Sequence, residues 1–302
     1  MMRLMVDASH KLKKKQGIAL LLCAGLALAI CLEAAKAPKH DLAWQAALFV
    51  RGIFGGLVAL AIAWPYLKSF KLFHTKLIVR SLLLSFYTIW MFYAVTKVSS
   101  ADVTTITSTQ PIWIALLSMF FLRKRYANLF WVAAVLVVVG MGILVNAKPP
   151  DTYGVIGILL LFTILRAISI MMVRAMMEIP ATIIALHYAL VVGILGVSIF
   201  FIEGGHRHMD VVFDTQGTVL LLIVAGSASV YQALVAKVIQ ILGSISGTIG
   251  IMVATVFAYA FGMTKPAFAF DFLQLLGLLL VILPAAWIVL SIKARVPQKL
   301  SP

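Results

Sequence analysis

Ten long apolar runs, separated by short polar segments, constrain the fold of this 302-residue chain more than any other feature. Most of them approach the roughly 20 residues that a helix needs to cross the hydrocarbon core of a bilayer. In lipid every backbone amide must find a partner within the protein, so each run is predicted to be helical. The sequence therefore predicts an all-α integral membrane protein with ten transmembrane helices, at residues 17–33, 43–65, 77–96, 101–122, 127–146, 153–173, 181–202, 217–236, 244–263 and 271–292.

Composition also points to lipid as the main solvent. The chain is 63% hydrophobic and only 12% charged, whereas soluble domains carry roughly 25% charged residues. The net charge of +15 does not indicate nucleic acid, because the lysines and arginines lie between the apolar runs, as topology signals do. Cys23 and Cys31 are about 12 Å apart along one predicted helix, too far to form a disulfide. We expect the lipid bilayer as a partner, and no nucleic acid, cofactor or metal.

The distribution of basic residues predicts the orientation in the membrane. Of the 25 lysines and arginines, Arg51 and Arg166 lie well inside apolar runs, whereas Arg80 lies near the start of the run 77–96. Only six lie in loops on the side opposite the N-terminus, namely Lys36, Lys39, Lys97, Lys148, Arg207 and Lys265. The others, Arg80 among them, are counted with the N-terminal side. The positive-inside rule then places both termini, residues 1–16 and 293–302, in the cytoplasm.

The first run follows a basic segment, as in a signal peptide, but nine more runs follow and we expect it to be retained. Short loops and the lack of an Asn-x-Ser/Thr site favour a bacterial inner membrane, so a multi-pass protein of the plasma membrane is expected.

The ten runs also divide into two halves. Residues 99–121 align with residues 242–264, which places Thr105-Ile106 on Thr248-Ile249. Each aligned block is followed by a polar break and one last apolar run. Because five is an odd number, the second half would enter the membrane from the opposite side. Inverted repeats, here expected at 17–146 and 153–292, are typical of secondary transporters.

Several short stretches resemble EamA-type members of the drug/metabolite transporter superfamily, and together the resemblance covers about residues 17–292. They are Arg51-Gly52-Ile53 in the second run, Ser99-Ser100-Ala101, Thr109-Gln110-Pro111 and Ala115-Leu116-Leu117 in the fourth, Gly140-Met141-Gly142 in the fifth and Leu165-Arg166-Ala167 in the sixth. The chain departs from the family at its Gly-Glu pairs, which are replaced by Leu122-Arg123-Lys124-Arg125 and Gly262-Met263-Thr264-Lys265. The ninth run also has no proline matching Pro111.

The resemblance implies a permease that moves a small amphipathic metabolite, such as an amino acid, by alternating access, with export as the expected direction. The substrate cavity would lie between the repeats, and the fifth and tenth helices would be peripheral. The alternative is an importer or exchanger of an anionic phosphorylated or nucleotide-type solute. A channel or an intramembrane enzyme is disfavoured, because no carboxylate lies deep in a run and no His-Glu-x-x-His is present. The oligomeric state is left open, and a monomer is compatible with the sequence.

Two arginines are the first candidates for the substrate site. Arg51 lies near the middle of the second run, and a guanidinium is costly in hydrocarbon and stays charged. It either binds backbone carbonyls, for example those freed near Pro111, or meets an anionic group of the solute. Arg166 lies well inside the sixth run. It either reaches the cytoplasmic face or nearby carbonyls, or makes the cavity positive.

Other candidates are polar or aromatic residues within the runs. His187 is either a hydrogen-bonded packing residue or a proton-coupling group, because its ordinary pKa lies near neutrality. The remaining candidates would line a cavity for an amphipathic solute, with packing or lipid contact as the other interpretation, and they are Trp90, Tyr93, Gln110, Trp113, Tyr231 and Gln232. Helix contacts or hinges are predicted at small residues and proline, at Gly52-x-x-x-Gly56, Gly243-x-x-x-Gly247 and Pro111.

Overall fold

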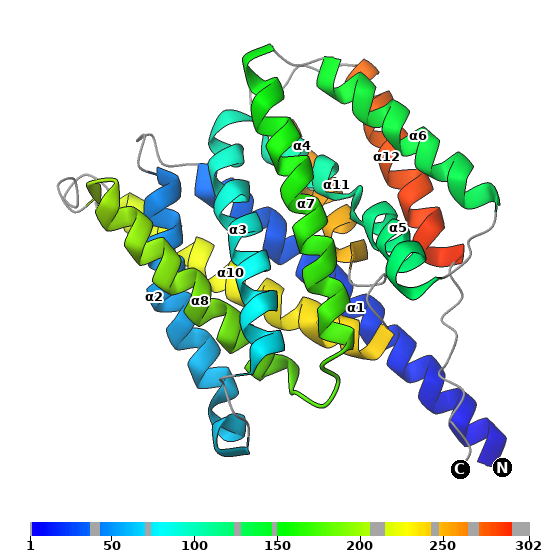
Figure 1. Cartoon of the computed structure of the whole chain (residues 1–302), viewed down its shortest axis with the longest axis horizontal. Coiled ribbons are helices and arrows are strands. Elements are labelled where there is room, and N and C mark those ends of the chain that lie inside the picture. The colour runs from blue at the N-terminus through cyan, green and yellow to red at the C-terminus, as the bar shows by residue number, and fades with distance from the viewer. Residues whose placement is uncertain are drawn as a thin grey trace.

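The computed structural model describes residues 2–36, 43–69, 74–123, 128–146, 150–205, 215–242, 248–264 and 272–291. All regular structure in these ranges is helical (Figure 1), which confirms the predicted all-α class. The α-helices are α1 (Met2–Lys36), α2 (Ala43–Ala63), α3 (Thr75–Lys97), α4 (Ser100–Thr107), α5 (Gln110–Leu122), α6 (Asn128–Asn146), α7 (Tyr153–Arg174), α8 (Ala181–Ile202), α10 (Thr215–Leu242), α11 (Ile249–Met263) and α12 (Phe272–Ser291). Short 3-10 turns cover Trp64–Ser69 and Pro150–Thr152.

Six helices in the described ranges are long and apolar enough to cross a membrane. They contain the segments Gln16–Ala35, Trp44–Leu67, Thr75–Lys97, Tyr153–Val173, Ala181–Ile202 and Thr215–Ile241. Three shorter apolar segments follow the same pattern, at Asn128–Ile143, Gly250–Met263 and Phe272–Pro284. The chain is therefore a multi-pass, all-α membrane protein, while the count of ten crossings stays a prediction.

The first helix is longer than predicted. Helix α1 begins at Met2 and continues through the basic segment, so residues 2–16 are not a separate element before the first span. Lysine, leucine and glutamine are good helix formers, and no glycine or proline occurs before Gly17. The apolar part that could lie in lipid, Gln16–Ala35, still agrees with the predicted run.

The fourth predicted span is broken into two helices. Helix α4 ends at Thr107 and α5 begins at Gln110, with Pro111 in the first turn of α5. A proline inside a continuous helix would lack its N–H and clash with the carbonyl four residues earlier, which is that of Thr107. Hydroxyls at the break bond to nearby carbonyls: the Ser108 Oγ donates to the Thr104 carbonyl at 2.8 Å, and the Thr109 Oγ1 to the Ile106 carbonyl at 2.8 Å. The prediction of a single helix over 101–122 was therefore wrong.

The helices contact one another mainly across the two halves of the chain. The main partners are α1 with α10 and α11, α2 with α8 and α10, α3 with α7 and α8, and α6 with α12. Each predicted span can be exchanged with its counterpart in the other half, five spans away. The exchange converts the α1–α10 contact into α7–α3 and the α2–α10 contact into α8–α3, and both of these contacts are observed. Two repeats related by a twofold axis would produce this self-consistent pairing, and the division into 17–146 and 153–292 stays a prediction.

Glycines allow the closest of these contacts. A Cβ added to Gly52 in α2 would lie 2.4 Å from the Cα of Gly193 in α8, so the two backbones touch at the crossing. One turn further, a Cβ on Gly55 would lie 2.8 Å from the Ser229 Oγ of α10, whereas one on Gly56 would meet nothing within 4 Å. The close face of α2 is thus formed by Gly52 and Gly55. Gly243 and Gly247 lie outside the described residues.

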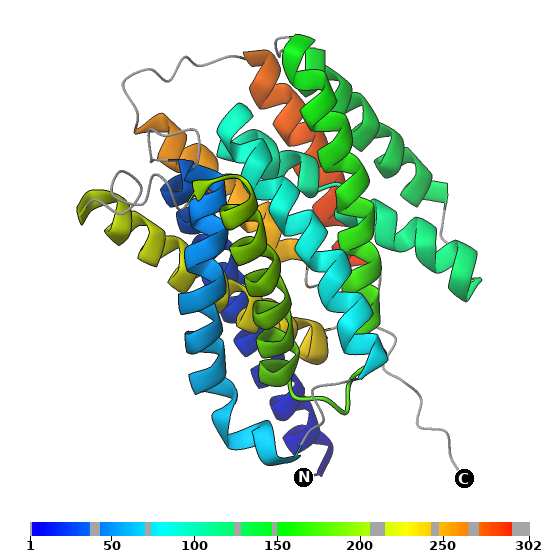
Figure 2. The ribbon, with the colours of Figure 1, turned by 60° about the vertical axis from the view of Figure 1, so that its left-hand side comes forward.

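Helices α6 and α12 lie side by side at one edge of the molecule (Figures 1 and 2). Their contact is also close, because a Cβ on Gly140 would lie 2.8 Å from the Gly277 carbonyl oxygen and 2.8 Å from the Leu280 Cβ. The site described below lies instead among α2, α3, α7, α8 and α10.

Candidate functional site

Arg51 is buried in the interior with a tyrosine as its hydrogen-bond partner. Its side chain is 4% exposed. The Nη2 donates to the Tyr188 hydroxyl at 2.8 Å, and the guanidinium carbon lies 5.5 Å from the centre of the Phe92 ring and 5.4 Å from that of Tyr188. The backbone carbonyls near Pro111, which were one predicted partner, are not among these contacts. Helices α2, α3 and α8 together hold this guanidinium.

Tyr188 joins Arg51 to a second buried arginine. The Tyr188 hydroxyl shares a 2.7 Å hydrogen bond with the Thr88 Oγ1 of α3, and its ring lies 5.8 Å from the guanidinium carbon of Arg80. Arg80 is 3% exposed and donates from Nη1 to the Ile184 carbonyl at 3.2 Å. Arg80 was counted only with the basic residues of the N-terminal side, but α3 begins five residues earlier and carries it into the interior.

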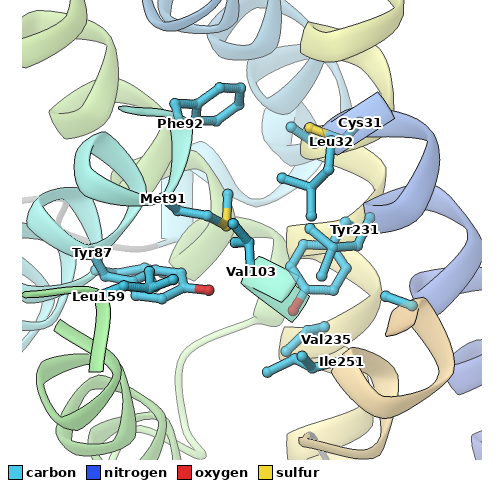
Figure 3. Packing of buried hydrophobic residues seen from close by; sticks show 14 of the residues in the cluster. Cys31, Leu32, Tyr87, Met91, Phe92, Val103, Leu159, Tyr231, Val235 and Ile251 are labelled. Carbon is cyan, nitrogen blue, oxygen red and sulfur yellow. The ribbon is translucent and has the colours of Figure 1, made fainter. Parts of the chain in front are cut away.

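Arg166 lies in a matching environment on α7, which packs against α3. It is 2% exposed, donates from Nη1 to the Tyr87 hydroxyl at 2.7 Å, and donates from Nη2 to the Tyr231 hydroxyl. The Tyr87 ring centre lies 4.6 Å from the guanidinium carbon. Figure 3 shows the hydroxyls of Tyr87 and Tyr231 pointing toward one another from opposite sides. The sequence analysis offered a bond to nearby carbonyls or a reach to the cytoplasmic face for Arg166, and the contacts above are neither of these.

Arg166 is connected to Arg80 through α7. The Ser169 Oγ, one turn from Arg166, donates to the Arg80 carbonyl at 3.2 Å. We use "arginine–tyrosine cluster" for Arg51, Arg80, Arg166, Tyr87, Tyr188 and Tyr231. Within the described ranges, none of its three guanidiniums contacts a carboxylate.

A polar face of α3 borders this cluster. Ser81, Ser85 and Thr88 recur at the spacing of one helix face, and all three are buried. The Ser81 Oγ lies 2.8 Å from the His187 Nδ1, and His187 is 7% exposed. This is the hydrogen-bonded environment that one interpretation of His187 predicted, and its proton-coupling interpretation stays a hypothesis.

A small cavity opens beside Arg51. It is lined by four polar residues and by alanine and valine side chains, from α2, α8 and α10: Arg51, Tyr188, Ser229, Gln232, Ala59, Ala185, Ala189 and Val192. Its free space accepts about one water molecule. The structure thus brings two predicted site residues, Arg51 and Gln232, to one small cavity.

Trp90 and Tyr93 lie elsewhere, toward the C-terminal end of α3. The Trp90 Nε1 donates to the Val155 carbonyl at 3.3 Å, and the two ring centres are 5.0 Å apart. Trp44 joins them at 5.7 Å from Tyr93. These rings form an aromatic group separate from the arginine–tyrosine cluster.

Gln110 and Trp113 lie at the break between α4 and α5. The Trp113 Nε1 donates to the Thr109 Oγ1 at 3.2 Å. The Gln110 side chain is fully buried, and neither polar atom of its amide has a partner among the described residues. Both residues help to shape the broken helix, and no contact in the described ranges joins them to the arginines.

Three cluster residues escaped the sequence analysis: Arg80, Tyr87 and Tyr188. Arg80 was missed because it follows the start of an apolar run by only a few residues. The available signal was the polar face at Ser81, Ser85 and Thr88, whose spacing predicts a buried polar stripe on one helix. Tyr87 and Tyr188 carry no such signal, because a tyrosine within an apolar run is equally suited to the core.

Together these helices and their cationic interior define a multi-pass membrane protein with a polar centre. Residues 15–146 match the EamA-like transporter family. This part of the chain is thus similar to that family, within the drug/metabolite transporter superfamily, as the resemblance implied. The matched residues nearly coincide with the first predicted repeat.

Comparison with solved structures shows the fold independently of the family. Among 28 matching chains, one crystal structure shares 15% sequence identity with this chain, with a TM-score of 0.62. The match covers 95% of this chain and 99% of that one. No curated protein matches the sequence.

Proposed function

We propose that this chain is a secondary transporter that carries a small organic solute with an anionic group across the membrane by alternating access. The observation that supports it most is the arginine–tyrosine cluster: three buried guanidiniums in a chain that is similar to a transporter family, none in contact with a carboxylate in the described ranges. Cations within membrane spans are costly and characteristically mark solute or ion pathways. An anionic solute would supply the missing counter-charge.

The surroundings of Arg51 suit a solute that is also partly apolar. Alanine and valine side chains line the same cavity as Arg51, Ser229 and Gln232. Small-molecule sites typically combine such apolar walls with a few fixed polar groups. Both expected solute classes, an amino-acid-like metabolite and a phosphorylated or nucleotide-type solute, bring at least one anionic group to this site.

The proposed mechanism uses the two repeats, 17–146 and 153–292, as the moving parts. The cluster draws its arginines from both repeats, with Arg51 and Arg80 in the first and Arg166 in the second. A solute bound to all of them would therefore couple to the relative position of the repeats, as in other transporters built from inverted repeats. We place the protein in the plasma membrane of a bacterium, with both termini in the cytoplasm and export as the direction.

Counterflow in proteoliposomes tests this proposal. Purified protein would be reconstituted and supplied with labelled amino acids, nucleotides and sugar phosphates, each with unlabelled solute inside. We expect saturable counterflow of an anionic solute, and its loss in Arg51→Gln at an equal amount of folded protein. Arg123→Gln is the matched control, because Arg123 is exposed at the end of α5.

Two results would count against the proposal. If counterflow occurred only with neutral or cationic solutes, the proposal that the solute carries an anionic group would be wrong. If Arg51→Gln lowered thermal stability but left counterflow per folded molecule equal to that of Arg123→Gln, the role of Arg51 would be structural.

A further inference from the structure

The acceptors of the three guanidiniums are all neutral. Arg51 and Arg166 donate to tyrosine hydroxyls, and Arg80 donates to a main-chain carbonyl. An arginine cannot be deprotonated in a protein, so three full positive charges remain in this interior. Neutral acceptors and aromatic faces offset only part of the free-energy cost of burying a cation. An anion that is hydrogen-bonded to the guanidinium offsets much more of that cost.

The cluster also keeps unused donors. The Nε of Arg80 and the Nε of Arg166 are buried with no hydrogen-bond partner among the described residues, and so is the Oγ of Ser85 on the same face of α3 as Thr88. A buried donor without a partner is unfavourable. Guanidiniums with free N–H groups match the oxygens of carboxylates and phosphates, which accept two hydrogen bonds at once.

We infer that the arginine–tyrosine cluster is a single site for a small dianion, a phosphate monoester or a dicarboxylate, and that in this structure tyrosine hydroxyls occupy the places of its oxygens. This inference rests on the proposed transport function and specifies the charge of its solute. Three cations are nearly balanced by two negative charges, whereas a monoanion leaves a surplus of two.

Zwitterionic amino acids fit this site less well. Their ammonium group would need a carboxylate partner, and the described carboxylates that have partners in the interior are held elsewhere. Glu33 accepts from Ser100, Asp102 caps the start of α4, and Glu203 accepts from Gln45. The amino acid expected from the family resemblance is therefore not the solute class that this site favours.

Tyrosine is suited to exchange with the solute. Tyr188 contacts both Arg51 and Arg80, and the hydroxyls of Tyr87 and Tyr231 both accept from Arg166. A bound dianion must take these donors from the hydroxyls. Removal of a hydroxyl should thus weaken the empty protein but not its complex, so that Tyr→Phe and Arg→Gln have opposite effects on affinity.

Matched pairs of ligands test the charge requirement in the purified full-length protein. Thermal unfolding and calorimetric titration would compare succinate with succinamate, and glycerol 3-phosphate with glycerol, at pH 7.5 and constant ionic strength. We expect one dianion to raise the unfolding temperature and to bind at least about tenfold more tightly than its less charged partner. The succinate and phosphate arms distinguish the two kinds of dianion.

Variants test the roles of the individual side chains. Arg166→Gln should abolish the dianion-induced shift, while Arg123→Gln should keep it. Tyr188→Phe should lower the unfolding temperature of the empty protein and give an equal or larger dianion-induced shift. Equal stabilisation by succinate and succinamate, and by glycerol 3-phosphate and glycerol, would overturn the inference even if a variant failed to fold. A loss of binding in Tyr188→Phe equal to that in Arg166→Gln would also overturn it.

The two proposals fail in different ways. If a monoanion supports Arg51-dependent counterflow and dianions bind no better than their partners, transport stands and the dianion site falls. If a dianion binds in the expected pattern but no solute crosses the vesicle membrane, the site stands and transport falls.

Discussion

The arginine–tyrosine cluster and the α6–α12 pair are opposite solutions to helix packing in one membrane protein. The cluster brings three guanidiniums and three tyrosines together among five helices. Helices α6 and α12 carry no charged residue, and they pack through Gly140 against Gly277 and Leu280 at the edge of the molecule (Figure 1). Small residues alone suffice to bring helices together in lipid.

The difference separates scaffold from site. The α6–α12 contact shows that this fold can join helices without buried charge. The cluster, by contrast, carries a desolvation cost of several kcal/mol per ion before any compensation. Helix association does not require that cost, which favours the proposed solute site, and the experiments below compare the two regions directly.

A new carboxylate should have the largest effect on transport, and only when it is placed beside the arginine–tyrosine cluster. Gln232→Glu places an acid in the cavity that Arg51 lines. It should pair with the arginines and exclude the solute, so that counterflow falls by more than about tenfold, or about 1.4 kcal/mol. Because buried cations gain a partner, the unfolding temperature should stay equal or rise.

The same change in α12 is the control. Gln274→Glu should leave counterflow per folded molecule unchanged and should not raise the unfolding temperature. If both variants lost transport and stability together, the contrast between the two regions would be wrong.

The glycine crossing beneath Arg51 comes next in expected effect. Gly52→Ala would place a methyl group 2.4 Å from the Gly193 Cα, where backbone must move. Separation of α2 and α8 should cost about 1–3 kcal/mol of stability and also reduce counterflow. Gly56→Ala is the control, because no atom lies within 4 Å of its added Cβ. Thermal unfolding and counterflow measure the two effects. If both variants behaved alike, the close contact of Gly52 with Gly193 would not be important for stability or transport.

A smaller effect is expected at Gly140, where stability and transport should separate. Gly140→Ala meets the Gly277 carbonyl oxygen and the Leu280 Cβ at 2.8 Å, so it should lower stability by about 1 kcal/mol. Counterflow per folded molecule should not change, because α6 and α12 lie away from the cluster. Gly142→Ala, with open space at its Cβ, is the control. A loss of transport in Gly140→Ala alone would show that this edge takes part in the mechanism.

His187 should give the smallest effect. His187→Gln can keep a hydrogen bond to Ser81, so the change in stability should stay below about 1 kcal/mol. Counterflow and its dependence on external pH should remain close to those of the wild type. A flattened pH dependence would instead support the proton-coupling hypothesis for His187.

Particular residues show how far the sequence led. The apolar runs predicted helices that the structure contains. Pro111 was predicted as a helix contact or hinge, but the complete break between α4 and α5 just before it was not. Hydrophobic periodicity does not show whether hydroxyls and a proline will end a helix or only bend it. Arg51, Arg166, Tyr231 and Gln232 were predicted as candidates because charge and polarity are conspicuous in an apolar run.

The sequence by itself determined the class of fold, because no arrangement except helices satisfies the backbone in lipid over such long apolar runs. Only the tertiary structure decided which residues form the site. Arg80 and Arg166 are 86 positions apart in the chain, and Tyr188 contacts Arg51 across 137. Such contacts depend on how α2, α3, α7 and α8 cross, and those crossings are decided by close backbone approaches such as Gly52 on Gly193. Local sequence patterns do not encode partners at that distance.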